Sequence, residues 1–79
     1  MKSNYKESDA FLLHATKFKE TSLLCVFFSK EFGKVSAVAK GARSKKSKFQ
    51  ALTVPGAIFK IAFSGKNELK TLTSCESLE

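Results

Sequence analysis

Short runs of hydrophobic residues alternate along the chain with polar or glycine-containing connections. Within residues 34–40 and 57–64, apolar side chains recur at every second position, which is the period of a half-buried β-strand. Residues 21–29 are apolar at nearly every position, as in a strand buried on both faces. The pattern predicts five strands: Ala10–Ala15, Thr21–Ser29, Lys34–Lys40, Ala57–Ser64 and Glu68–Cys75.

The connections between these strands suggest how they are arranged. The first two are short enough for hairpins, residues 41–54 form a longer connection that breaks the alternation, and Gly65-Lys66-Asn67 is a turn. Three strands, a long connection and two more strands are typical of the OB-fold, a five-stranded Greek-key barrel. An SH3-like barrel and a small open sheet have a similar strand count, and both remain alternatives.

A chain of 79 residues makes one small domain with a modest core. Residues 1–9 are polar and are expected to be a flexible lead-in, with the barrel over residues 10–79. Two cysteines without CxxC spacing and a single histidine do not supply the usual four zinc ligands, so we expect no metal or other cofactor. No signal peptide or membrane span is evident, which indicates a cytoplasmic protein.

The net charge of the chain is +7, because it contains 14 Lys and Arg residues but only 7 Asp and Glu residues. Such a domain attracts polyanions. Lysine lacks the planar fork that reads base edges, so the chain is expected to bind the nucleic-acid backbone without sequence preference. A solvated charge run is the alternative. Five cations without an acid lie in the long connection and its start: Lys40, Arg43, Lys45, Lys46 and Lys48.

Aromatic residues fall into two groups. Phe18 lies between two lysines and Phe49 follows Lys48, so both are candidates for stacking on unpaired bases; the alternative is that they close the ends of the barrel. The remaining strand phenylalanines are expected in the core: Phe11, Phe27, Phe28, Phe59 and Phe63. No catalytic triad, phosphate-binding glycine loop or paired-carboxylate spacing is present, and we predict no enzymatic activity.

Several segments together resemble the start of proteins of the RecO family. They include Ala10–His14, Phe18–Leu23 and Gly33-Lys34-Val35, and the most specific is Val38-Ala39-Lys40-Gly41-Ala42-Arg43-Ser44. Later positions, Pro55, Gly65 and Glu68–Glu76, match in order and spacing. The resemblance covers most of the chain.

The resemblance implies an OB-fold that contributes to binding single-stranded and duplex DNA in recombinational repair and strand annealing, in the bacterial cytoplasm and nucleoid. It implies RecR as a partner, whereas contact with single-strand-binding protein is doubtful without the family's helical domain. Matching the family's basic loop makes Lys40, Arg43, Lys45 and Lys46 DNA contacts. Charge alone adds Lys17, Lys34, Lys60 and Lys70. Two alternatives stay open: a module that mainly docks a partner such as RecR, and an RNA-binding OB protein.

Overall fold

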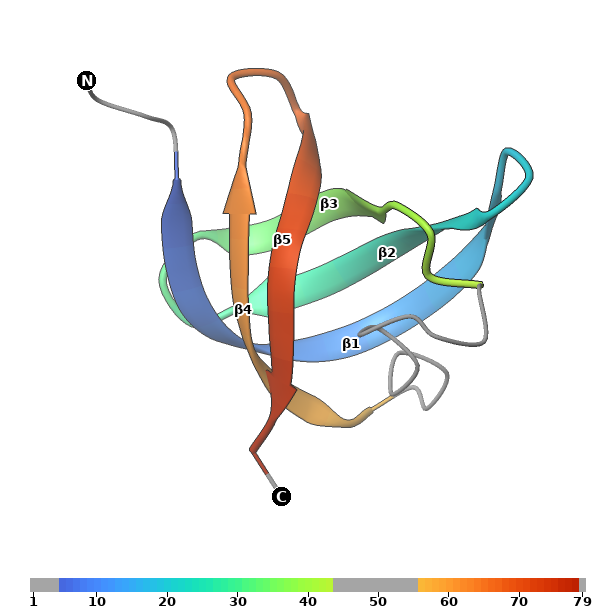
Figure 1. Cartoon of the computed structure of the whole chain (residues 1–79). Coiled ribbons are helices and arrows are strands. Elements are labelled where there is room, and N and C mark those ends of the chain that lie inside the picture. Colours follow the sequence, from blue (N-terminus) through green and yellow to red (C-terminus); the bar gives the residue numbers. More distant parts are fainter. Residues whose placement is uncertain (1–4, 44–55, 79) are drawn as a thin grey trace.

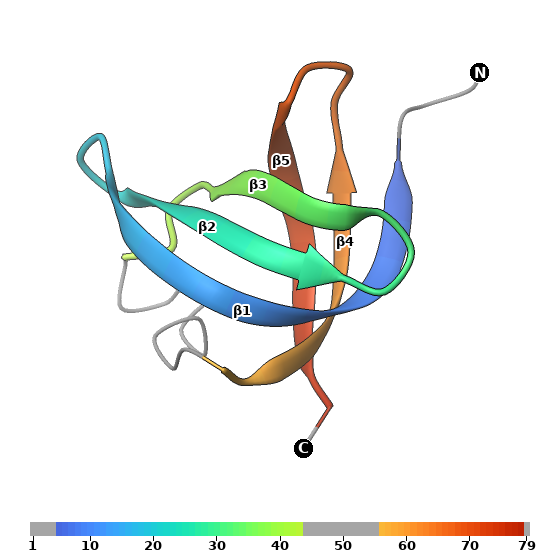
Figure 2. The same cartoon turned by 180° about the vertical axis from the view of Figure 1, so that it is seen from behind.

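The computed structural model describes residues 5–43 and 56–78, which form a closed five-stranded barrel (Figure 1, Figure 2). The strands are β1 (Lys6–Phe18), β2 (Ser22–Ser29), β3 (Gly33–Ala39), β4 (Ile58–Ser64) and β5 (Leu69–Ser77). In this part of the chain, no helix is long and apolar enough to cross a membrane.

The strand order around the barrel is β1-β2-β3-β5-β4, and β4 closes the ring by pairing with β1. Strands β3 and β5 run parallel, with Ser36 opposite Leu69 and Val38 opposite Thr71, while the other four pairs are antiparallel. This is the predicted five-stranded OB-type barrel, and its closure excludes the open sheet.

Strand β1 is long enough to pair with two neighbours. Its first half, Lys6–Phe11, pairs with β4, and its second half, from Ala10 to Phe18, pairs with β2. The sequence predicted a flexible lead-in through residue 9, but the strand already begins at Lys6. Residues from Lys6 onward pair with β4. Ser8 is buried there, and its Oγ accepts from Glu31 N at 3.2 Å and donates to Asp9 O at 2.9 Å. The polar composition of residues 6–9 therefore gave no indication that they form part of a paired strand.

The core contains the inward side chains of all five strands. The largest of them with almost no exposure are Phe27, Phe59, Leu12 and Ile61. The inward alternation predicted for β3 and β4 is confirmed, and so is the core position of three phenylalanines. The full cluster is Ala10, Leu12, Cys25, Phe27, Val35, Ala37, Ala39, Ala42, Phe59, Ile61, Phe63 and Leu72.

Two register shifts redirect side chains in the long strands. In β1 the register to β2 shifts between Leu12 and His14, and Leu13 points into solvent. In the β4–β5 pair the register shifts between Ala62 and Phe63. Leu72 and Cys75, three residues apart on β5, thereby both contact the core. Such irregularities bend a strand, and a small barrel needs that bending to close.

Two phenylalanines that the sequence placed in the core lie on the outside instead. Phe11 is 47% exposed and Phe28 is 54% exposed, and they are direct partners across β1 and β2. Opposite residues of an antiparallel pair share one face of the sheet. Their neighbours Leu12 and Phe27 are also direct partners and fill the inward face, so the pleat turns Phe11 and Phe28 outward.

Candidate nucleic-acid interface

Part of the predicted basic loop lies in the turn that follows β3. Lys40 and Arg43 are both exposed there, and Ala42 between them is buried in the core cluster. Gly41 has a φ of 70°, a conformation that residues with a side chain rarely adopt, so the glycine permits this turn. Four predicted site residues lie outside the described residues: Lys45, Lys46, Lys48 and Phe49.

Arg43 holds the turn between β1 and β2. Its Nη1 donates to Glu20 O at 2.8 Å and lies 3.5 Å from Lys19 O, and its backbone N donates to Thr21 O at 3.0 Å. Lys19 has a φ of 57°, which is uncommon for a residue with a side chain. Its Nζ lies 5.5 Å from the ring centre of half-buried Phe18. The guanidinium therefore has a structural role besides its charge.

The lysines predicted from charge are distributed over different faces. Lys17 is exposed near the end of β1, opposite Leu23 on β2. Lys60 is exposed on β4, where its partners in register are Asp9 on one side and Glu76 on the other. Opposite charges on both neighbouring strands reduce the positive potential around Lys60.

The other two, Lys34 and Lys70, meet in one groove at the end of the barrel where the β4–β5 turn lies. The groove has a volume of about 730 Å³. The start of β1, the β2–β3 turn, the start of β3 and the β4–β5 turn converge on it. Four of its lining residues are lysines and one is an acid. We call it the lysine groove; its lining is Lys6, Phe32, Lys34, Val35, Ser36, Phe63, Gly65, Lys66, Glu68 and Lys70.

Three contacts shape the β1 and β4–β5 sides of the lysine groove. Phe32 packs edge-to-face on Phe63, with ring centres 5.7 Å apart, and Lys6 Nζ lies 6.0 Å from the Phe32 ring centre. Lys70 Nζ donates to Gly65 O at 3.2 Å, which joins the base of β5 to the turn that precedes it. Gly65 has a φ of 127°, which favours glycine at this position.

A serine fixes the β2–β3 turn on the other side of the groove. Ser29 Oγ accepts from Phe32 N at 2.9 Å and donates to Gly33 O at 2.8 Å, and Ser29 is almost fully buried. A satisfied buried hydroxyl of this kind restrains the turn. The lysine groove therefore combines a restrained aromatic side with three exposed lysines and the hydrogen-bonded Lys70, an arrangement suited to a polyanion.

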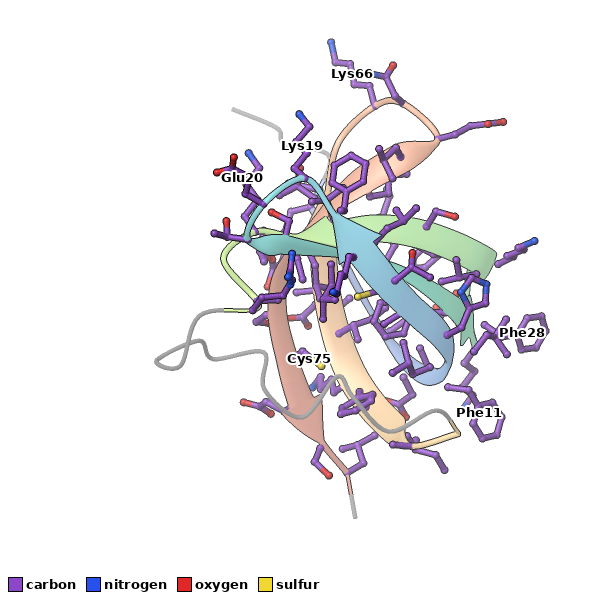
Figure 3. All side chains as sticks on the ribbon, turned by 90° about the vertical axis from the view of Figure 1, so that its right-hand side faces the viewer. Phe11, Lys19, Glu20, Phe28, Lys66 and Cys75 are labelled. Carbon is purple, nitrogen blue, oxygen red and sulfur yellow. The ribbon has the colours of Figure 1, made fainter. Side chains whose placement is uncertain are left out.

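Sequence reasoning did not name Lys6, Lys66 or Phe32 as site residues. Lys6 was assigned to the lead-in, and Lys66 was one residue of a predicted turn. The OB-fold itself carried a signal for Lys66, because its β4–β5 loop is one of the two loops that border the binding face. Lys66 lies in that turn, at the top of Figure 3.

One buried thiol, Cys25, and one partly buried thiol, Cys75, lie away from the lysine groove. Burial raises the pKa of the Cys25 thiol to about 11. Burial, with a smaller repulsion from Cys25, raises the pKa of the Cys75 thiol to about 12. Both cysteines are free, and both thiols are protonated near neutral pH and therefore weak nucleophiles.

The barrel and its basic groove can be compared with known proteins. The family described as "Recombination protein O N terminal" matches the chain over residues 1–79. The chain belongs to the RecO N-terminal family. This confirms the resemblance carried by several segments of the sequence, of which the segment from Val38 to Ser44 is the most specific.

Individual RecO proteins agree with this assignment. The chain is 46% identical over 66 residues to the DNA repair protein RecO of Actinobacillus pleuropneumoniae serotype 5b, an alignment that covers 84% of the chain and 28% of the relative. It is 44% identical over 69 residues to the RecO of Salmonella dublin, covering 87% of the chain and 28% of the relative. With the RecO of Laribacter hongkongensis it shares 39% over 71 residues, covering 90% and 29%. The chain thus spans less than a third of these relatives.

Proposed function

We propose that the chain binds DNA, single-stranded and duplex, without sequence preference, as the N-terminal module of a RecO-type protein of recombinational repair and strand annealing. The observation that carries the proposal is the convergence of four lysines on one groove of an OB-type barrel. Membership of the RecO family and the relatives' description as DNA repair proteins support DNA as the polyanion. The activity belongs to the bacterial cytoplasm, at the nucleoid.

The mechanism is neutralisation of phosphates. Each ammonium group that replaces a condensed counterion makes binding more salt-dependent, by about 0.9 in the slope of log K against log salt for duplex DNA and about 0.7 for a single strand. Three exposed cations of the lysine groove, Lys6, Lys34 and Lys66, are free to follow the phosphate path. Lys70 is tied to Gly65 O and contributes mainly its charge. The predicted contacts of Lys40 and Arg43 extend this surface beyond the groove.

The test compares two double variants that lose the same charge. Lys34→Ala with Lys66→Ala removes two groove lysines, and Lys17→Ala with Lys60→Ala removes two exposed lysines outside the groove. Labelled single-stranded and duplex DNA of mixed sequence is titrated with each protein across a salt series, and binding is followed by fluorescence anisotropy. The groove variant should lose up to about 1.8 of the salt slope on duplex DNA and up to about 1.4 on single strands.

The control variant should keep nearly the wild-type slope, and it tests the wider set of contacts predicted from charge. Equal losses in both variants would mean diffuse attraction instead of a groove. If a folded wild-type sample binds no DNA at low salt, the proposal is wrong, and docking of a protein partner such as RecR becomes the better explanation.

A further inference from the structure

The outer surface of the barrel carries two exposed aromatic rings side by side. Phe11 and Phe28 are cross-strand partners, each about half exposed, and Figure 3 shows both rings directed away from the barrel. Solvation of this much apolar surface is unfavourable, since full burial of a phenylalanine stabilises a protein by about 1.5–3 kcal/mol. Adjacent exposed rings therefore indicate a binding surface.

The two rings border a shallow, mostly apolar hollow. Its volume is about 180 Å³, and Ala10 and Ile58 complete its apolar lining. Asp9 and Lys30 also line it, and Lys30 N donates to Asp9 O at 2.9 Å, which holds the start of the β2–β3 turn against β1. A planar group that lay on Phe28 would thus have an apolar surface beneath it and a cation within reach.

Lys34 connects this aromatic surface to the lysine groove. It lies directly opposite Phe28 on β3, on the same outer face of the sheet, and it also lines the groove. Neighbouring strands are about 4.8 Å apart, so the side chains of Phe28 and Lys34 leave the sheet from adjacent positions on the same face. Figure 2 shows this outer face of β1, β2 and β3 towards the viewer, with the β4–β5 turn beyond it.

A DNA strand has the chemistry that matches this juxtaposition. Its phosphates are attracted to Lys34 and the groove lysines, and an unpaired base presents a flat apolar face to a ring. Stacking of bases on aromatic side chains does not depend on sequence, because every base has a π-face. In a duplex the faces of the bases are already stacked on one another. The β2–β3 surface is also the face with which OB-folds bind oligonucleotides.

We propose that Phe28, with Phe11 beside it, is the stacking platform for an unpaired base of a single strand whose phosphates lie along Lys34 and the lysine groove. The platform rests on the proposed DNA binding and adds to it a preference for single strands. Removing the Phe28 ring should weaken single-strand binding and leave duplex binding nearly unchanged.

The experiment uses Phe28→Ala, Phe28→Leu and Phe11→Ala, with Leu13→Ala as the matched control. Leu13 is another half-exposed apolar residue of β1. All three residues are outside the core cluster, so the four variants should fold, which circular dichroism and thermal unfolding verify. Binding of oligo(dT) and of a duplex is measured by anisotropy. Stacking contributes about 1–3 kcal/mol per base, so Phe28→Ala should weaken oligo(dT) binding by about 5-fold to 140-fold.

The duplex affinity of Phe28→Ala should change by less than about twofold. Phe28→Leu keeps an apolar side chain without a ring and should lose nearly as much single-strand affinity as Phe28→Ala, while Leu13→Ala should lose none. If Phe28→Ala loses equal affinity for oligo(dT) and for the duplex, the stacking proposal is wrong. It is also wrong if Phe28→Leu binds oligo(dT) as tightly as the wild type.

Unchanged oligo(dT) binding by Phe28→Ala, together with altered self-association in sedimentation, would mean that the rings cover a protein surface, and the platform is wrong. These outcomes leave the proposed DNA binding intact. Absence of all DNA binding in the folded wild type overturns both proposals together.

Discussion

Replacement of Arg43 by lysine separates the charge of this residue from its hydrogen bonds. The guanidinium donates to Glu20 O at 2.8 Å and lies near Lys19 O, and neither contact can be reproduced in the same geometry by an ammonium group. The backbone bond from Arg43 N to Thr21 O is retained. Arg43→Lys therefore keeps the net charge and removes the side-chain brace of the β1–β2 turn.

The size of the effect follows from the environment of the brace. A hydrogen bond to a charged group contributes about 1.5–3 kcal/mol where it is shielded. Arg43, Lys19 and Glu20 are all exposed, so water competes for these groups and we expect a loss of about 1 kcal/mol. For a domain of this size, that lowers the melting temperature by about 4–8 °C.

Thermal unfolding followed by circular dichroism measures the loss, and amide hydrogen exchange shows whether it is local. Exchange should accelerate in Lys19–Thr21 without DNA present. Lys40→Ala is the control, because Lys40 is an exposed cation of the same turn, and it should melt within about 2 °C of wild type. If Arg43→Lys has the stability and exchange of the wild type, the brace contributes nothing and Arg43 acts by charge alone.

Two further predictions concern the core. Phe27→Ala leaves a cavity in the centre of the barrel and should lower the free energy of unfolding, measured in urea, by about 3–5 kcal/mol. Phe28→Ala changes the neighbouring but half-exposed residue and should lower it by less than about 1 kcal/mol. Equal losses in the two variants would contradict the assignment of Phe27 to the inner face and Phe28 to the outer face. The raised pKa values of Cys25 and Cys75 mean that the folded state holds these protons more tightly than the unfolded state. The free energy of unfolding should therefore fall as pH rises above about 9 towards 11 and 12, and the decrease should be smaller in Cys25→Ala; an identical decrease would refute a contribution from this thiol.

The strand pattern was sufficient to predict the number and order of the strands. Strands β3 and β4 have a period of two in the sequence because alternate side chains pack in the core. Their other face is only partly exposed, since Val38 and Ala62 are buried there. The long connection between residues 41 and 54 then separated three strands from two, which indicated the OB-fold. Closure of the barrel requires β1 to pair on both sides, and its polar first half gave no hydrophobic signal for this.

The pattern could not assign the faces of β2. Residues 23–28 are all apolar, so alternation cannot show which side chains point inward. The register with β1 decides it: Leu12 pairs with Phe27 inside, and Phe11 therefore pairs with Phe28 outside. The register shift after Leu12 then changes which residues of the rest of β1 point inward, and no residue type at this position predicts the shift.

The lysine groove was partly predictable, because Lys34 and Lys70 were identified from charge while Lys6 and Lys66 were not. The four lysines come from three separate segments of the sequence, around residues 6, 34 and 66–70. The pairing of β1 with β4 and the parallel pairing of β3 with β5 bring them together. A cluster of charged residues within one segment can be recognised in a sequence. A cluster that forms only when strands from different segments pair cannot. Charge along the sequence therefore indicated the run from Lys40 to Lys48.

The two proposals together divide DNA binding into two separable contributions. Phosphate neutralisation acts on both DNA forms and decreases with salt, while stacking acts on unpaired bases and has little salt dependence of its own. Lys34→Ala should therefore reduce the salt slope on both forms, and Phe28→Ala should lower single-strand affinity at every salt concentration with the slope unchanged. Because the duplex slope per contact is steeper, rising salt should increase the preference of the wild type for single strands. Under the two proposals, the barrel would hold a single strand mainly by its phosphates and leave its other bases accessible.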